Sequence, residues 1–248
     1  MNSKILAVGL TGLLATASVS ADTLLGVYAK AGGWNHAPSG TFGDTANGFD
    51  LEQDLGMDTE SGSMISIALE HFIPLVPNIK IERTDLSFSS TGTLTQAITF
   101  GGINFSSGAV VTSEVDLSHS DFILYYELLD NWVSFDFGVN VKVFDGVLEV
   151  ATGGSTGTID LSAPVPMLYG KAQFDLPFSG FSAGAEGSYI GFDGDSFTDV
   201  RGYIGYEFML GLGVELGYRN LALQFDDLDD ANIDTTFEGA YISATFHL

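Results

Sequence analysis

The segment SHSD, Ser118 to Asp121, places two hydroxyl groups, an imidazole and a carboxylate side by side in the chain. Hydrolysis by a serine–histidine mechanism needs a nucleophile, a base and a carboxylate that converge in space. On a β-strand, adjacent side chains leave opposite faces, so His119 can pair with Asp121 while both serines point away. We therefore expect a hydrogen-bonded histidine and no enzyme. A lipid or peptide hydrolase, using these residues or His71 beside Glu70, is the alternative.

Acidic residues are clustered in three segments, 50–60, 193–199 and 226–230. Calcium takes about six to eight oxygen ligands, and Asp193, Asp195 and Asp199 have a loosely suitable spacing. The segment lacks the glycine and the final glutamate of a helix–loop–helix calcium loop. We expect a solvated acidic surface with no metal and no cofactor. Binding of divalent cations or of the cell envelope by these acidic loops is the alternative.

The charge balance excludes two classes of partner. The chain has 32 acidic and 8 basic residues, for a formal net charge of −24. Binding to nucleic acid requires a basic surface that neutralises phosphates, and electrostatic docking on anionic lipid requires one as well. We therefore expect no nucleic-acid partner. The chain also has no cysteine, which excludes disulfides and thiol catalysis and suits an oxidising compartment.

The first 21 residues have the composition of a secretory signal peptide. Lys4 forms a short basic region, the stretch ILAVGLTGLLATA is apolar, and Val19 and Ala21 occupy the positions that a signal peptidase reads. We expect cleavage before Asp22. Residues 22–248 then form one domain outside the cytoplasm.

Strict alternation of apolar and polar residues marks the stretch NWVSFDFGVNVKVFDG, residues 131–146, as a β-strand. The same pattern recurs along the chain, and no segment gives a convincing amphipathic helix. Near Arg83, Ser118 and Asn220 the alternation changes phase, and a β-bulge is the simplest explanation. We expect strands at residues 23–34, 62–72, 78–89, 110–127, 132–144, 164–176, 180–192, 197–210, 212–226 and 233–248.

The connections between these strands alternate in length. Every second one is short: IPLVPN, ELLDNW, LPFSG and MLG. The others are longer or more polar: 35–61, 90–109, 145–163, FDGDSFTD and DDLDDAN. Short periplasmic turns on one rim and longer loops on the other are typical of an outer-membrane barrel. The sequence therefore predicts an all-β fold: a single transmembrane up-and-down antiparallel β-barrel of about ten strands, with both termini periplasmic. A soluble all-β domain is the alternative.

The basic residues that follow the signal peptide all lie within predicted strands: Lys30, Lys80, Arg83, Lys142, Lys171, Arg201 and Arg219. Six stand on the polar row of their strand, and Arg83 lies at a change of phase. Bases and acids gathered on one face suit a barrel interior, where opposite charges compensate each other. We expect a lumen charge network of Glu70, Asp136, Lys142, Lys171, Glu186, Arg201, Glu207, Glu215 and Arg219.

Five stretches also carry a resemblance: DLEQDLGM, EHFIPLVPNIKI, SDFILYYELLDNWVSFDFGVNVKVFDG, PMLYGKAQFDLPFSG and GLGVELGYRNLALQFDDLDD. They resemble an uncharacterised family of small Gram-negative outer-membrane β-barrel proteins, and the resemblance covers most of residues 22–248. It implies the fold and a location in the bacterial outer membrane. Members of that family typically end in phenylalanine, whereas this chain ends in Leu248. The resemblance provides no catalytic residues.

The expected function is that of an integral outer-membrane barrel, either structural or a narrow passage for small solutes. A ten-stranded lumen can be filled largely by side chains, whereas aqueous channels typically need about 16 strands. A gap could run past Gly138, Gly184 and Ser188. We expect a monomer that contacts outer-membrane lipid, lipopolysaccharide and, during biogenesis, the barrel-assembly machinery. Val139→Arg is expected to cost about 2–4 kcal/mol, and Asn140→Ser little.

Overall fold

A computed structural model describes residues 25–43, 48–162, 164–228 and 231–248. The expected signal peptide and its cleavage site lie outside these residues. All regular structure in the described part of the chain is β-strand. No helix among the described residues is long and apolar enough to cross a membrane.

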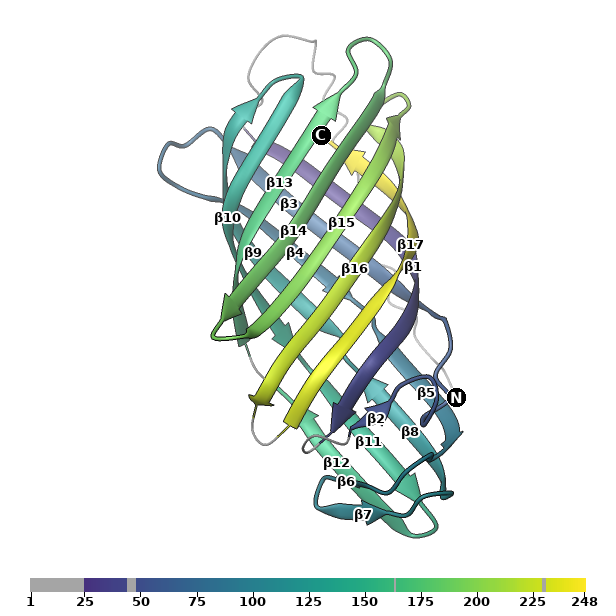
Figure 1. The fold of residues 1–248 in the computed structure, drawn as a ribbon. Coiled ribbons are helices and arrows are strands. Elements are labelled where there is room, and N and C mark those ends of the chain that lie inside the picture. The colour runs from purple at the N-terminus through teal and green to yellow at the C-terminus, as the bar shows by residue number, and fades with distance from the viewer. Residues whose placement is uncertain (1–24, 44–47, 163, 229–230) are drawn as a thin grey trace, which may run out of the picture.

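Ten strands form a closed antiparallel barrel (Figure 1). They are β1 (Leu25–Gly43), β3 (Glu60–His71), β4 (Asn78–Thr84), β9 (His119–Asp130), β10 (Val133–Phe144), β13 (Pro164–Asp175), β14 (Phe181–Phe192), β15 (Asp195–Glu207), β16 (Leu212–Leu228) and β17 (Ala231–His247). Each pairs with the next in this order, and β17 pairs with β1 to close the barrel. The predicted all-β fold, a single antiparallel up-and-down barrel of ten strands, is confirmed.

Four further strands continue one wall of the barrel beyond its rim. We call β5 (Ser87–Thr93), β8 (Val110–Asp116), β11 (Gly146–Thr152) and β12 (Ser155–Leu161) the extension sheet. Their order matches that of the barrel strands β4, β9, β10 and β13, which they adjoin in the chain. The short strands β2 (Phe49–Asp50), β6 (Ile98–Phe100) and β7 (Ile103–Phe105) lie at the same end, the extension end (Figure 1). The opposite rim, the short-turn rim, carries the turns 72–77, 131–132, 176–180 and 208–211.

The extension sheet corrects several predicted boundaries. The predicted strands 78–89 and 110–127 are each two strands, because the chain leaves the barrel at residues 85–86 and 117–118. The predicted loops 90–109 and 145–163 contain strands of the extension. The first barrel strand runs to Gly43, nine residues beyond its predicted end. The connection FDGDSFTD, from the set expected to be longer or more polar, is a tight turn of Asp193 and Gly194, with φ of 54° and 102°.

The phase changes have a cause other than bulges. The pairing of β16 with β15 and β17 runs through Asn220 without a shift of register. Each side chain therefore keeps its direction, inward or outward. What changes at Asn220 is the residue type: the inward row passes from polar to apolar and the outward row from apolar to polar. On the side of Asn220 toward the short-turn rim, Arg219 is buried inside and Tyr218 is exposed outside. On the side toward the extension end, Leu221 is buried inside and Gln224 is exposed outside. The predicted bulge at Asn220 is wrong.

The same exchange occurs on β4 and β5. Glu82 and Thr84 are buried inside while Ile81 is exposed, and beyond them Leu86 and Phe88 are buried inside. Arg83 points outward and is exposed. Across β8 and β9, the inward row likewise changes from valine and leucine to histidine and aspartate at Ser118. The inward row thus changes between polar and apolar residues at a common level of the barrel, on β16, between β4 and β5, and between β9 and β8.

On the short-turn side of this level the barrel exterior is a continuous belt of exposed apolar side chains, which we call the exterior band. Its members include Ile65, Ile67, Leu69, Ile79, Ile81, Phe122, Leu124, Phe135, Phe137, Val139, Val141, Leu168, Val200, Ile204, Leu216 and Ile242. On the extension side of the level, the apolar residues are inside. Trp34, Phe88, Phe144, Phe197 and Phe237 belong to one buried core that continues between the extension sheet and the long ends of β1, β16 and β17.

Candidate functional site

An ion-pair layer crosses the interior of the barrel next to the apolar core, on the side toward the short-turn rim. Its cations are Lys80, Lys142, Arg201 and Arg219, and its carboxylates are Glu82, Asp121, Glu186 and Asp199. No side chain in the layer is more than 11% exposed. Four positive and four negative charges cancel, as buried charges must if they are to remain ionised.

Arg219 on β16 is the most connected member of this layer. Its Nε and Nη2 donate to the two carboxylate oxygens of Asp199 at 2.8 and 2.7 Å, and its Nη1 donates to the hydroxyl of Thr84 at 2.9 Å. Nη2 also lies 3.3 Å from Nε2 of His119. The guanidinium carbon is 4.8 Å from the ring centre of Trp34. Arg219 therefore joins β15, β4 and β9 to the floor of the apolar core.

Arg201 and Lys80 form the other half of the layer. Arg201 donates to both carboxylate oxygens of Glu82, at 2.8 and 2.7 Å, in the bidentate geometry that suits a guanidinium group. It also donates to Glu186, which accepts a second bond from Lys80. These contacts connect β15, β14 and β4 across the lumen.

Lys142 and Asn140 on β10 complete the layer. Lys142 is fully buried and contacts Asp121 at 2.8 Å and Asp199 at 2.9 Å. Asn140 donates through Nδ2 to Asp121 at 2.6 Å and to the hydroxyl of Ser188 at 3.0 Å. The amide of Asn140 thus fixes two inward side chains on different strands.

These contacts change the expectation for Asn140→Ser. A serine is too short to reach both Asp121 and Ser188, and buried groups that lose a partner cost about 1–3 kcal/mol each. We expect the free energy of unfolding in detergent to fall by about 1–3 kcal/mol. A change at an outward position of the same strand, Val141→Ala, is the control for loss of side-chain volume. An Asn140→Ser protein as stable as the parent would show that the amide bonds contribute nothing.

Tyrosines fill the places where the sequence suggested a gap. A Cβ added to Gly184 would lie 2.7 Å from the ring of Tyr203, so this glycine makes room for that ring. A Cβ added to Gly138 would lie 2.1 Å from the backbone oxygen of Leu124, so that position is closed by the neighbouring strand. Tyr203 also donates to Gln173 at 2.8 Å. The voids among the ion pairs measure about 20 and 10 Å³, which is room for at most a single water each.

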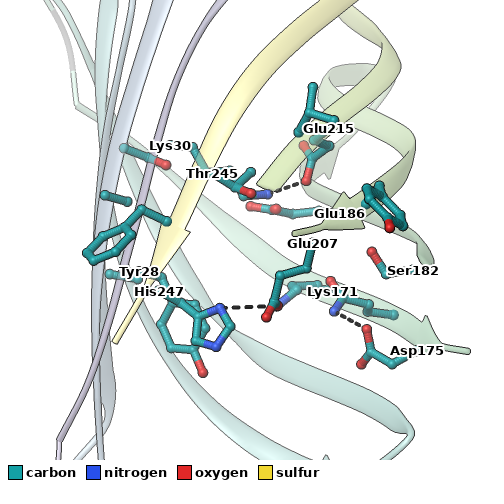
Figure 2. A pocket seen from close by; sticks show the side chains of 18 of the residues that line it. Tyr28, Lys30, Lys171, Asp175, Ser182, Glu186, Glu207, Glu215, Thr245 and His247 are labelled. Atoms are coloured by element: carbon teal, nitrogen blue, oxygen red, sulfur yellow. Dashed lines mark hydrogen bonds and ion pairs between the residues drawn. The ribbon is translucent and has the colours of Figure 1, made fainter. Parts of the chain in front are cut away.

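A pocket of about 390 Å³, lined by many charged side chains, opens from the ion-pair layer toward the short-turn rim (Figure 2). Lys30 donates to Glu215 at 2.7 Å, and His247 lies 3.4 Å from Glu207 at the mouth. Deeper in the pocket, Lys171 lies 3.5 Å from Asp136. The pocket is a vestibule that ends at the ion-pair layer.

All nine residues expected in a lumen network lie in the ion-pair layer or in this vestibule. Lys142, Glu186, Arg201 and Arg219 are in the layer; Glu70, Asp136, Lys171, Glu207 and Glu215 line the vestibule. The expected set omits four members of the layer: Lys80, Glu82, Asp121 and Asp199. Lys80 and Glu82 stand two apart on the inward row of β4, and the alternation of that strand already places Lys80 on its polar row. Asp121 and Asp199 were assigned instead to catalytic and metal candidates.

The catalytic candidates around His119 do not converge. His119 is fully buried, with Nδ1 2.8 Å from the carbonyl oxygen of Leu117 and Nε2 3.8 Å from Asp121. The hydroxyl of Ser118 donates to Asp85 on the other face of the strand, at 3.2 Å. Ser120 lies 3.4 Å from Arg83. Neither hydroxyl is placed to transfer its proton to His119.

The three aspartates considered for calcium are also separated. Asp199 belongs to the ion-pair layer, Asp195 accepts a bond from the backbone N–H of Asp226 at 2.9 Å, and Asp193 forms the β14–β15 turn. Asp199 meets His119 and Asp121 with ligand atoms within 4.8 Å of one another. Lys142 already binds both carboxylates, and Arg219 binds that of Asp199. A cation at that point would therefore have to displace bound ammonium and guanidinium groups.

Part of the acidic segment 50–60 has a structural role. Asp54 accepts hydrogen bonds from the backbone N–H and hydroxyl of Thr95, at 2.8 and 2.7 Å, and from the backbone N–H of Asp50 at 3.0 Å. Burial opposes ionisation of Asp54, but the bonds from Thr95 and Asp50 prevail and hold its pKa below the ordinary 3.8. The carboxylate thereby fixes the turn to the loop that leads to β6.

A pH dependence follows for this turn. Because the pKa of Asp54 is lowered by folding, its contribution is present above the ordinary pKa and is lost as the pH falls through the lower, folded-state pKa. We expect hydrogen-exchange protection of the Gly56 and Met57 amides to be high near pH 6 and reduced below about pH 4. Asp54→Ala should lose that protection at both pH values, whereas Asp58→Ala should retain it. Equal protection in all three proteins would contradict this role.

Comparison with known proteins adds the following. No family model and no curated protein matches the chain. Among solved structures, it is similar to Ail, the attachment invasion locus protein of Yersinia pestis, with 7% identity and a TM-score of 0.37 over 90% of this chain and 100% of that one. It is also similar to CymD, a monoaromatic hydrocarbon channel, with 12% identity and a TM-score of 0.34 over 92% and 70% of the two chains. A FadL homologue from Pseudomonas aeruginosa gives 10% identity and a TM-score of 0.35 over 90% and 89%. At such identities and TM-scores, these similarities assign neither a family nor a ligand.

Proposed function

We propose that this chain is an integral outer-membrane barrel whose lumen is closed and whose extension sheet stands outside the cell. The observation that carries the proposal is the exchange of faces along the strands. The exterior band would be costly in water over so large a continuous area, and the charges of the ion-pair layer would be costly in lipid. The exterior band is placed favourably if lipid surrounds the barrel on the short-turn side of the exchange level, and the ion-pair charges are then enclosed in the lumen, away from that lipid. Water then surrounds the extension.

The proposed orientation places the short-turn rim in the periplasm. Short turns on that side and larger structures on the other are the usual plan of such barrels. The extension segments 85–118 and 145–163 contain no lysine or arginine. The lipid and lipopolysaccharide of the outer membrane are the proposed partners of the exterior band, with the chain acting as a monomer and without catalysis. The last strand, β17, would be the segment that the barrel-assembly machinery reads.

The turns of the short-turn rim support contact with the membrane interface. Leu75, Phe178 and Leu210 each have a left-handed backbone, with φ between 62° and 69°, and each is at least 87% exposed. Bulky side chains adopt this conformation at an energetic cost. An exposed apolar tip is reasonable where headgroups and acyl chains meet it, and Trp132 lies at the same rim.

The closed lumen favours a structural or surface-presenting role over passage of solutes. Two successive barriers lie on the axis: the ion-pair layer, where each void has room for at most a single water, and the apolar core on its extension side. Removing one barrier leaves the other. We therefore propose that the protein does not conduct ions across the membrane at rest.

Two measurements test the proposal. The chain has no native cysteine, so Ser155→Cys on the extension sheet and Leu210→Cys on the short-turn rim can be labelled singly. In intact cells, a membrane-impermeant maleimide should label residue 155 and not residue 210, and both should react after the envelope is disrupted. The reverse pattern would overturn the orientation. In planar bilayers the purified protein should give no discrete conductance steps, and regular steps would overturn the closed lumen.

A further inference from the structure

A second cavity lies on the other side of the ion-pair layer, between the barrel and the extension sheet. It has a volume of about 110 Å³. Its walls come from the loop after β2 and from β1, β8, β10, β11, β12, β13, β15, β16 and β17: Phe42, Leu51, Val115, Leu117, Phe144, Leu148, Leu161, Ser162, Val165, Phe197, Leu223, Phe225, Ile233, Thr235 and Phe237. The cavity is thus framed by residues of both the barrel and the extension sheet.

The lining is almost entirely hydrocarbon. Five phenylalanines and eight aliphatic residues form the walls, and Ser162 and Thr235 carry the lining's side-chain hydroxyl groups. Phe144 and Phe197 are stacked with ring centres 5.8 Å apart. Cavities of this character stay dry, since a water would find too few hydrogen-bonding partners.

The floor of the cavity offers no charge to a ligand. Lys142 lies 5.8 Å from the ring centre of Phe197, but its ammonium group is bound by Asp121 and Asp199. The ring of His119 lies 5.3 Å from that of Phe144, and Nδ1 of His119 is held by the backbone. A charged molecule would therefore lose its hydration here without gaining a partner.

We propose that this cavity binds one small, uncharged apolar molecule, aromatic or compactly branched, of about benzene size. Protein interiors are otherwise close-packed, so a void of this volume forfeits contacts that such a molecule would restore. For comparison, an engineered apolar cavity of about 150 Å³ binds benzene. The inference goes beyond the proposed function, and it holds whether or not the lumen conducts.

Fluorine NMR of fluorobenzene with the full protein in detergent tests the proposal. Fluorobenzene dissolved in micelles gives a signal that grows linearly with concentration, whereas molecules in the cavity should give a separate signal that saturates at one equivalent. Nuclear Overhauser effects to methyl groups of Val115, Leu148 and Leu223 should locate it in the wild-type protein. Fluorobenzoate, which has the same ring but carries a charge, should give no saturable signal.

Two variants that fill the cavity provide the second arm. Leu161→Phe and Val165→Phe lie at its partly exposed edge, where a larger ring can be accommodated with little strain, and each should lose the saturable signal. Leu216→Phe and Val139→Phe make the same changes on the exterior band and should retain it. No saturable signal in the wild type, contacts to methyl groups elsewhere, or equal binding of fluorobenzoate would each overturn the proposal, independently of how the filled variants fold.

Discussion

Replacing Arg219 with leucine is expected to lower the free energy of unfolding by about 3–5 kcal/mol, since removal of one partner strands a buried charge. Asp199 would keep only Lys142, and Thr84 would lose its guanidinium donor. The side chain also packs under Trp34, so the floor of the apolar core would lose a contact. The measurement is equilibrium unfolding in urea with lipid vesicles or detergent, followed by tryptophan fluorescence.

A double replacement separates the stranded charge from the lost volume. Arg219→Leu with Asp199→Leu removes one cation and one carboxylate, so the layer stays neutral. We expect the double variant to be more stable than Arg219→Leu alone, because well-packed apolar residues can replace a buried ion pair at little net cost. A double variant that is less stable by the full sum of the single losses would contradict charge compensation as the role of the layer.

Val139→Arg is expected to lower the free energy of unfolding by about 2–4 kcal/mol, the cost of a cation near the bilayer midplane. Val139 lies on the exterior band and is 49% exposed. Only burial in lipid makes an arginine costly at such a position, since exposed surface substitutions in water usually change stability by less than about 0.5 kcal/mol. Urea unfolding in lipid vesicles provides the measurement.

The matched control is Thr112→Arg, on the outer face of β8, which lies on the extension side of the level where the two rows exchange residue type. Thr112 is exposed, and we expect its replacement to leave the stability within about 0.5 kcal/mol of the parent. If Val139→Arg were as harmless as Thr112→Arg, the exterior band would not lie in lipid. If both were equally harmful, lipid would extend over the extension.

The barrel could be predicted from the sequence because its two faces differ so strongly. A strand such as β10 alternates without interruption from Val133 to Val143, and its boundaries agree with the prediction to within one residue. In the closing strand β17 the same alternation holds only from Ala240 to Phe246, because nearer its start Ile233 and Phe237 stand on the inward row. Period-two alternation is a local property of the chain, so it needs no knowledge of what lies across the lumen.

The extension could not be predicted in the same way, because its strands invert the pattern. If the outward row is assumed to stay apolar, the alternation changes phase at Ser118, and a bulge is then the simplest interpretation. In the structure the direction of the side chains is constant and the surroundings change. The prediction failed because it treated the environment as uniform along each strand.

The polar interior was predicted by composition but not by pairing. The alternation along each strand shows that Lys142 and Arg219 point inward. Their common partner Asp199 lies on a third strand, and the stagger between the strands decides whether it meets them. Asn140 was expected to tolerate change for the same reason: its two hydrogen bonds are to β9 and β14. Contacts across a lumen are set by closure, which short-range patterns do not encode.

The exchange of faces along β16 is the most direct test of the account. Single spin labels at the outward positions 214, 216, 218, 220, 222 and 224, in the cysteine-free background, can be scanned for collision with oxygen, which concentrates in lipid, and with a nickel chelate, which stays in water. We predict preference for oxygen at 214, 216 and 218 and preference for the chelate at 220, 222 and 224. Uniform preference for either reagent along the strand would contradict the account.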